Sequence, residues 1–326
     1  MRVATMTAAV LGFLCSSAVP DDARAQGAWP AKPLRFVLPY PPGGAIDILG
    51  RMLALPLGEA LGQNVVPDNR GGANGIVASD LVARAPADGY TIYLASVGQV
   101  SINPAAYRKL PYDPFRDLSP VILHSGIASL LLAHPAVPAA NVKDFIAFAR
   151  SRPDGLSYAT PGAASTNHLS TELFASMTGL KLTHVPYKGS GPALIDLIGG
   201  QVQMMFDQIT SSLPHVKSGK LKALAVTTAK RSALLPELPA VAESGFPGFD
   251  TSSWNGVMAP AGTPRPVIDR LNRTIASFHA RPEFRERLLS VGAEPIGGTP
   301  EDFSRHGRRE LERWTEILRK SGTRLD

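Results

Sequence analysis

The sequence predicts an α/β protein built from two domains. Short apolar runs alternate with segments of helical periodicity, which is the pattern of mostly parallel sheets covered by helices. Proline and glycine gather at the connections, as loops require. The chain has 326 residues, and the roughly 300 that follow an N-terminal leader are large for one core and suit two domains of ordinary size.

The leader covers residues 1–25 and has the features of a secretory signal peptide. Arg2 supplies the positive charge, residues 8–14 form a short apolar core, and residues 23–25 form an A-x-A cleavage site. This core is too short for a membrane-spanning helix, which needs about 20 apolar residues. We therefore expect export to the periplasm with cleavage after Ala25. The single cysteine, Cys15, leaves with the leader, so the mature chain can form no disulfide.

Strands are predicted where short apolar runs are bounded by turn-forming residues. In chain order these runs are 34–38, 65–66, 91–95, 121–123, 129–133, 156–159, 182–186, 204–206, 223–227 and 254–259. Helices are predicted where apolar residues recur at helical spacing. They begin near Asp47 and then cover 76–85, 142–150 with Asn141 as N-cap, 167–177, 193–198, 266–278 with proline at its start, and 300–320. The pattern loosens across 236–249.

Charge and motif content argue against several functions. The formal net charge is +6, but Lys and Arg are spread along the chain without a block or interleaved aromatics, so we expect no nucleic-acid binding. The seven histidines are scattered without metal-ligand spacing, so we expect no metal and no cofactor. Gly189-Ser190-Gly191 is not the elbow motif of a serine hydrolase. Catalysis therefore finds no support.

The segment 34–51 forms a corner of strand, tight loop and helix that is suited to anion capture. Its loop contains Pro42, Gly43 and Gly44 and carries no nucleophile and no metal ligand. Glycines let backbone N–H groups approach a ligand, and the following helix N-terminus attracts negative charge. Asp47 either caps its own helix or orients the loop, and we favour this structural role.

Two further corners repeat the arrangement. In the first, a strand ends in Pro-Gly, and Ser165, Thr166 or Asn167 can cap the next helix or hold a carboxylate. In the second, at 187–192, Lys188 can pair with an anion or face solvent. Asp207 follows the apolar run 204–206, where ligands gather at the carboxyl ends of parallel strands, and is either a contact or a turn aspartate.

Several longer motifs resemble the Bug-type extracytoplasmic solute receptors, the substrate-binding subunits of tripartite tricarboxylate transporters. They cover essentially the whole mature chain and are Trp29 to Arg35 leading into Pro41-Pro42-Gly43-Gly44, Asn69 to Ala73, Asp88 to Thr91, Asn103-Pro104, Tyr107 to Asp113, His184 to Val202, Gly219 to Thr227 and Ala259 to Pro264.

The resemblance implies a two-domain Venus-flytrap periplasmic binding protein, type II-like, with the ligand in the interdomain cleft. Domain 1 would be discontinuous, 26–124 plus 253–326, and domain 2 would be 125–252. In the family the ligand is usually a small carboxylate, and ordered water helps to hold it. Carried over to this sequence, the cleft-lining residues would be Pro42, Gly43, Gly44, Asp47, Ser96, Gly98, Thr160, Ala164, Ser165, Thr166, Asn167 and Asp207.

Some positions depart from the family pattern. Ala45 and Ile46 stand where a hydroxyl residue is frequent, the loop 95–98 has lost a hydroxyl, and Gln208 stands where Asn is common. Fewer hydroxyls favour an acid less polar than citrate or aspartate.

We expect a monomeric receptor without catalytic activity that delivers a small organic acid to membrane permease subunits. Two alternatives stay open: a sensory receptor that presents its ligand to a two-component kinase, and an exported hydrolase.

Overall fold

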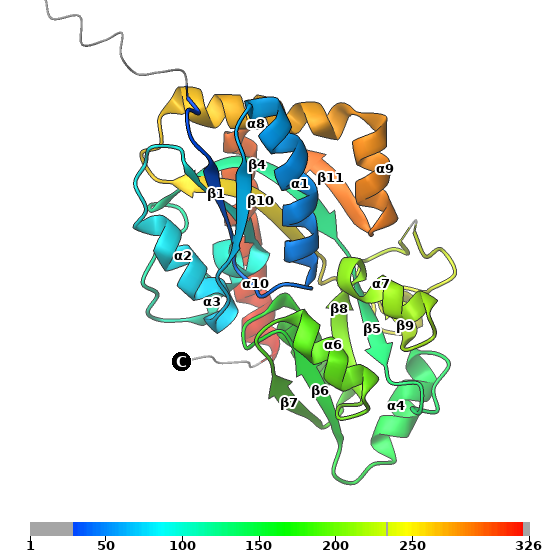
Figure 1. Ribbon diagram of the computed structural model, residues 1–326. Coiled ribbons are helices and arrows are strands. Elements are labelled where there is room, and N and C mark those ends of the chain that lie inside the picture. The colour runs from blue at the N-terminus through cyan, green and yellow to red at the C-terminus, as the bar shows by residue number, and fades with distance from the viewer. Residues whose placement is uncertain (1–28, 233, 322–326) are drawn as a thin grey trace, which may run out of the picture.

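The computed structural model describes residues 29–232 and 234–321, and two β-sheets organise this part of the chain (Figure 1). The strands of the first sheet are β1 (Leu34–Leu38), β2 (Val65–Asn69), β3 (Thr91–Ser96), β4 (Leu118–Ile127), β10 (Ser253–Pro260) and β11 (Ala293–Gly297). Those of the second are β5 (Ser129–Ala133), β6 (Leu156–Thr160), β7 (Leu182–Pro186), β8 (Met204–Gln208) and β9 (Lys222–Val226). The strand orders are β11-β4-β10-β3-β1-β2 and β7-β6-β8-β5-β9.

Both sheets are mixed, so the prediction of mostly parallel sheets is wrong. β1 pairs in parallel with β2 and β3, but β10 lies antiparallel to β3 and β4. In the second sheet β6 is parallel to β7 and β8, and β5 is antiparallel to β8 and β9. Every antiparallel pair involves β4, β5 or β10, the strands at which the chain passes between the sheets. β4 leads into β5 of the other sheet through the single residue Ala128.

Helices pack around each sheet. Around the first lie α1 (Ala45–Leu61), α2 (Ile76–Ala83), the short α3 (Asn103–Ala106), α8 (Arg265–Ala280), α9 (Pro282–Ser290) and α10 (Pro300–Ser321). Around the second lie α4 (Val142–Arg150), α5 (Thr166–Thr178), α6 (Ser190–Ile198) and α7 (Ile209–Lys217). We call the first sheet with its helices lobe 1 and the second with its helices lobe 2. The predicted helices are present, whereas α3, α7, α9 and β11 were not predicted.

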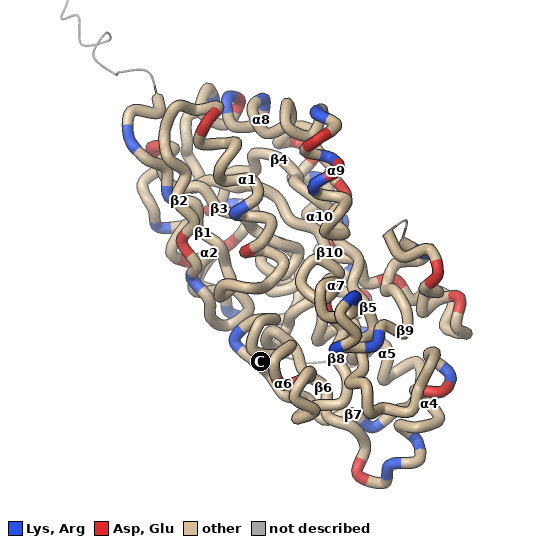
Figure 2. Tube along the Cα trace, turned by 45° about the vertical axis from the view of Figure 1, so that its right-hand side comes forward, with Lys and Arg blue, Asp and Glu red and all other residues tan. Residues whose placement is uncertain are grey.

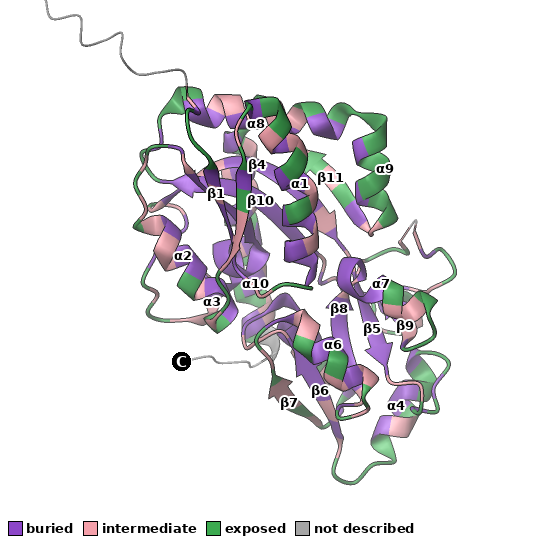
Figure 3. Ribbon diagram, in the orientation of Figure 1, coloured by how far each residue is buried: buried purple, intermediate pink, exposed green. Residues whose placement is uncertain are grey.

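The sheets form the core of each lobe, with the outward faces of the helices exposed (Figure 3). Phe36, Leu94 and Leu271 are fully buried in lobe 1, and Phe174 and Phe206 are fully buried in lobe 2. Sheets covered on both faces by apolar side chains are rigid platforms. The loops at their ends are therefore held in fixed positions.

Sheet membership divides the chain into the segments 34–127 and 253–297 for lobe 1 and 129–226 for lobe 2. The expected division into 26–124 plus 253–326 and 125–252 stays a prediction. Lys, Arg, Asp and Glu are spread over both lobes (Figure 2). Within the described ranges no helix is long and apolar enough to cross a membrane. The predicted leader, 1–25, lies outside those ranges.

Candidate ligand-binding site

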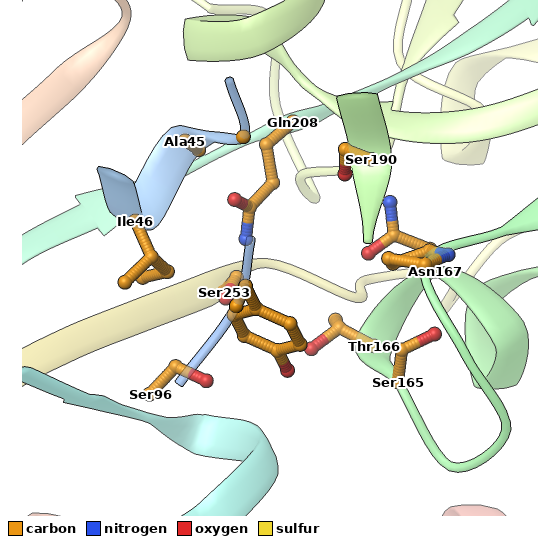
Figure 4. Close-up of a pocket in the computed structure, with 12 residues that line it drawn as sticks. Ala45, Ile46, Ser96, Ser165, Thr166, Asn167, Ser190, Gln208 and Ser253 are labelled. Atoms are coloured by element: carbon orange, nitrogen blue, oxygen red, sulfur yellow. The ribbon is translucent and has the colours of Figure 1, made fainter. Parts of the chain in front are cut away.

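A small cavity of about 30 Å³ lies between the two lobes (Figure 4). Both lobes contribute to its wall, which consists of Tyr40, Gly44, Ala45, Ile46, Ser96 and Ser253 from lobe 1 and Pro161, Ser165, Thr166, Asn167, Ser190 and Gln208 from lobe 2. None of these lining residues carries a charge. An anion bound here is therefore held by neutral groups.

Four helix N-termini meet at this cavity. Gly44 is the N-cap of α1, Ser165 of α5 and Gln208 of α7, and Ser190 is the first residue of α6. The first N–H groups of a helix have no partner within it, and the helix dipole adds partial positive charge there. The wall thus gathers positive potential from both lobes, and a carboxylate fits that potential.

Asp47 holds the first loop rather than facing the cavity. Its carboxylate accepts hydrogen bonds from Gly43 N (3.1 Å), Asn69 Nδ2 (3.0 Å) and Arg51 Nε (2.9 Å). The N–H of Gly43 is therefore engaged within the loop. Gly43 has φ +93°, a conformation that favours glycine, whereas Gly44 has φ −89° and is extended. Gly43 is therefore the position of this loop that requires glycine.

Ser165 caps α5. Its hydroxyl donates to Gly162 O (2.7 Å) and accepts from His168 N (3.2 Å). The hydroxyl of Thr166 makes no hydrogen bond within residues 29–232 and 234–321 and lies at the wall. Of the two roles proposed for these hydroxyls, capping therefore belongs to Ser165, and Thr166 keeps a donor for a ligand.

Asp207 is fully buried behind the wall. It accepts hydrogen bonds from Ser190 Oγ (2.7 Å), Ser211 Oγ (2.6 Å) and Asn167 Nδ2 (3.2 Å). Burial raises the pKa of its carboxyl to about 6, although these hydrogen bonds act in the opposite direction. Asp207 thus fixes the positions of the lining residues Ser190 and Asn167.

A buried polar network joins the two lobes beside the cavity. Tyr40 Oη donates to Asn74 Oδ1 (2.6 Å), and Asn74 Nδ2 donates to Ala164 O (2.8 Å) in lobe 2. Burial raises the pKa of Tyr40 to about 12, so its hydroxyl keeps its proton at neutral pH. Asn74 and Ala164 both have positive φ, 48° and 59°. The hydrogen bond between them connects the lobes directly.

Two histidines support the loop that precedes α5. Thr160 Oγ1 lies 2.7 Å from His184 Nε2, and Ala164 N donates to His168 Nδ1 (3.3 Å). The two imidazoles stack with their centroids 4.2 Å apart. Burial lowers the pKa of both to about 4, so both are neutral at pH 7. They are structural groups that support the loop.

The structure brings five of the twelve predicted residues to the wall: Gly44, Ser96, Ser165, Thr166 and Asn167. The other seven surround it without lining it, namely Pro42, Gly43, Asp47, Gly98, Thr160, Ala164 and Asp207. Tyr40 and Ser253 are wall residues that carried no sequence signal, because only the approach of the lobes places them there. No group of three or more His, Cys, Asp or Glu that could hold a metal occurs in the described ranges.

Comparison with known proteins identifies the family. Residues 49–323 match the model of the tripartite tricarboxylate transporter family receptor. The chain belongs to this family. It is 35% identical to protein BugT of Bordetella pertussis, over 98% of this chain and 99% of the relative. The resemblance to Bug-type receptors is thereby confirmed.

Solved structures confirm the fold of a two-domain periplasmic binding protein. A protein of R. palustris solved with adipate is 43% identical, with a TM-score of 0.89, covering 90% of this chain and 98% of that chain. The periplasmic binding protein BugD is 36% identical, with a TM-score of 0.88, covering 91% of this chain and 100% of that chain.

Proposed function

We propose that this receptor captures a small organic carboxylate between its lobes in the periplasm and delivers it to the permease subunits of a tripartite tricarboxylate-type transporter. The observation that carries the proposal is the convergence of four helix N-termini from both lobes on one uncharged cavity. N–H groups and hydroxyls there stabilise a negative charge without a counter-ion. The adipate complex of the R. palustris relative supports this ligand class.

The cavity volume of about 30 Å³ is room for no more than a few water molecules. A carboxylic acid of several carbons therefore enters when the lobes separate, and closure then buries it. In this proposal the cavity binds and releases an unchanged solute, and the protein acts as a monomer without catalytic activity. The buried groups near the cavity are each hydrogen-bonded within the protein: Asp207 to Asn167 and Ser190, His184 to Thr160 and His168 to Ala164.

A thermal-shift screen tests the proposal. Ligand at a hundredfold excess over its dissociation constant stabilises the folded state by about 2.7 kcal/mol. Adipate and other small mono- or dicarboxylates should raise the melting temperature, and their amides or methyl esters should not. An equal response to acids and amides would remove the basis for the proposal.

Export and delivery have their own tests. We propose that the leader is removed after Ala25, so N-terminal sequencing of the periplasmic protein should begin at Gln26. A cell that lacks the receptor should lose high-affinity uptake of the ligand found in the screen, and restoring the gene should restore uptake. Uptake that does not depend on the receptor would contradict the transport role.

A further inference from the structure

Asp207 is a fully buried carboxyl group whose hydrogen-bond partners are all neutral. Ser190 Oγ and Asn167 Nδ2 donate to its Oδ1, and Ser211 Oγ donates to its Oδ2. Within residues 29–232 and 234–321 no Lys, Arg or His side chain forms an ion pair with it. Burial without a cation raises the pKa of this carboxyl to about 6, so its charge changes close to neutral pH.

The other titratable side chains around β8 do not bind Asp207. On the elements that pack against β8 they are Tyr158, His168, Glu172, Asp196, His215 and Lys217. In the described part of the chain none of the six is a hydrogen-bond or ion-pair partner of Asp207. Burial lowers the pKa of His168 to about 4, and it also lowers the pKa of His215, which lies in the last turn of α7. Near pH 6.5 the charge beside the cavity that can change is therefore that of Asp207.

The three side chains that bind Asp207 belong to the helices whose N-termini form the lobe 2 wall. Asn167 is the second residue of α5, Ser190 the first of α6 and Ser211 the third of α7. Asn167 and Ser190 also line the cavity and lie on the same side of it (Figure 4). A bound anion and the Asp207 carboxylate therefore share these two side chains as neighbours and draw on the same helix dipoles.

The hydrogen bonds around Asp207 leave a place for one added proton. A proton on Oδ2 donates to Ser211 Oγ, and the Ser211 hydroxyl then turns its own proton to Gln208 O, which lies 3.1 Å away. Oδ1 keeps its role as the acceptor for Ser190 and Asn167. The carboxyl can thus become neutral without moving the two side chains that line the cavity.

From this geometry we infer that Asp207 is a proton-binding site coupled to the cavity, so that the receptor takes up a proton together with its carboxylate ligand. The inference rests on the proposed receptor function and adds a second, linked ligand to it. Two negative charges that share neutral neighbours and have no cation between them repel each other. Protonation of Asp207 removes this repulsion, and by reciprocity the bound anion strengthens proton binding at Asp207 by the same factor, about tenfold.

Titration calorimetry with adipate, in buffers of different ionisation enthalpy, counts the protons that the wild-type protein takes up on binding. With a tenfold coupling we expect uptake of about half a proton per adipate at pH 6.5 and almost none at pH 8.5. Affinity should fall about fivefold from pH 6 to pH 8, because binding that takes up a proton weakens as the pH rises. Free adipate is mostly ionised at pH 6.5, since such carboxyl groups titrate about two pH units lower, and its own titration would release protons rather than take them up.

Asp207→Asn tests the site itself, because the side chain keeps its shape and stays neutral at every pH. Its amide can donate to Ser211 Oγ as the protonated carboxyl does. The variant should take up no proton, bind adipate with an affinity that does not change from pH 6 to pH 8, and bind about tenfold more tightly than the wild type at pH 8. Asp154→Asn is the matched control, since Asp154 is an exposed acid of lobe 2 away from the wall, and it should behave as the wild type does.

Three results would overturn the inference and leave the receptor function standing. The first is a wild-type protein that binds adipate without proton uptake, a measurement that decides even if Asp207→Asn does not fold. The second is proton uptake that persists in Asp207→Asn. The third is a folded Asp207→Asn, with the melting temperature of the wild type, that binds adipate no more tightly at pH 8, because Asp207 would then only position the wall. A wild-type protein that binds no organic acid overturns the receptor function itself.

Discussion

At the scale of single residues, the start of α5 separates structural from ligand-facing hydroxyls. Ser165 and Thr166 are adjacent and chemically alike, but only the Ser165 hydroxyl is engaged with the backbone, through Gly162 O and His168 N. The same loop therefore uses one hydroxyl to fix its shape and offers the next to the cavity. Sequence alone could not divide these roles, because either residue can cap a helix.

Ser165→Ala and Thr166→Val should have opposite effects. Loss of the Ser165 cap should lower the free energy of unfolding by about 1 kcal/mol with ligand affinity nearly kept. Loss of the Thr166 hydroxyl should leave stability nearly unchanged and weaken carboxylate binding about tenfold or more, because a hydrogen bond to a charged group is removed. Urea unfolding and calorimetric titration of both variants check this. The reverse ranking would show that Ser165 contacts the ligand.

The two neighbouring glycines of the first loop should also differ. Gly43 has φ +93°, so Gly43→Ala should lower the free energy of unfolding by about 1–2 kcal/mol, although no other atom lies within 4 Å of the added carbon. Gly44→Ala is the control. Gly44 is extended, and its added carbon would lie 3.7 Å from Ser190 Cβ, an ordinary contact. Equal losses in urea unfolding would contradict the backbone argument.

At the scale of elements, the contact between the turn η1 (Ala73–Gly75) and the loop before α5 links the lobes. Asn74→Gly suits the positive φ of this residue and removes the side chain that donates to Ala164 O. We expect adipate affinity to fall roughly three- to tenfold, because the closed state loses a hydrogen bond that the open state does not have. Calorimetric titration measures this change. Wild-type affinity in Asn74→Gly would show that the contact does not contribute to closure.

The packing of α8 and α9 on β4 encloses a pair of histidines that should make the fold sensitive to acid. His124 Nδ1 lies 3.0 Å from His279 Nε2, and the second nitrogen of each ring has no hydrogen-bond partner among residues 29–232 and 234–321. Burial lowers the pKa of both imidazoles well below 6.5. The neighbouring His279 also lowers the pKa of His124, and the charge of Arg285 also lowers the pKa of His279. Between about pH 6.5 and pH 4 the unfolded chain therefore binds protons that the folded chain does not bind. The contribution of these histidines to the free energy of unfolding is complete above about pH 6.5 and is lost as the pH drops toward 4.

Urea unfolding from pH 7.5 to 4.5 tests this expectation. Each such group contributes up to about 1.4 kcal/mol of lost stability per pH unit in this window. His124→Leu removes one of the groups and should reduce the slope. The raised pKa of Asp207 acts in the opposite sense, since its contribution to stability is lost as pH rises through about 6. Asp207 is present in both the wild type and His124→Leu, so its contribution does not change the difference between their slopes. An unchanged slope in His124→Leu would contradict the assignment.

The elements that the sequence predicted are those with strong local signals. Asn141 caps α4 by accepting from Asp144 N (3.0 Å), as its position before an amphipathic segment indicated. The helix α7 was not predicted because Thr210, Ser211, Ser212 and Pro214 are weak helix formers, and it forms where β8 ends and Asp207 accepts from Ser211. Asp207 itself was expected as a contact, but its carboxylate turns away from the cavity to order its neighbours.

At the scale of the whole molecule, the site exists only because two lobes meet. The α/β fold and the two-sheet architecture follow from local patterns, but Tyr40, Ser253 and Gln208 come together through contacts between residues far apart in the sequence. No local pattern encodes such a contact. The prediction of mostly parallel sheets was wrong for a related reason. The chain passes between the lobes at β4, β5 and β10, and these strands pair antiparallel with their neighbours.

A crystal structure of the protein with adipate would show directly whether the cavity between the lobes holds a carboxylate through backbone N–H groups. Adipate should lie in that cavity. Its carboxylate oxygens should lie within hydrogen-bond distance of the backbone N–H groups that begin α1 and α5, with no Lys or Arg side chain in contact. Adipate bound elsewhere, or held in the cavity by a cationic side chain, would contradict it.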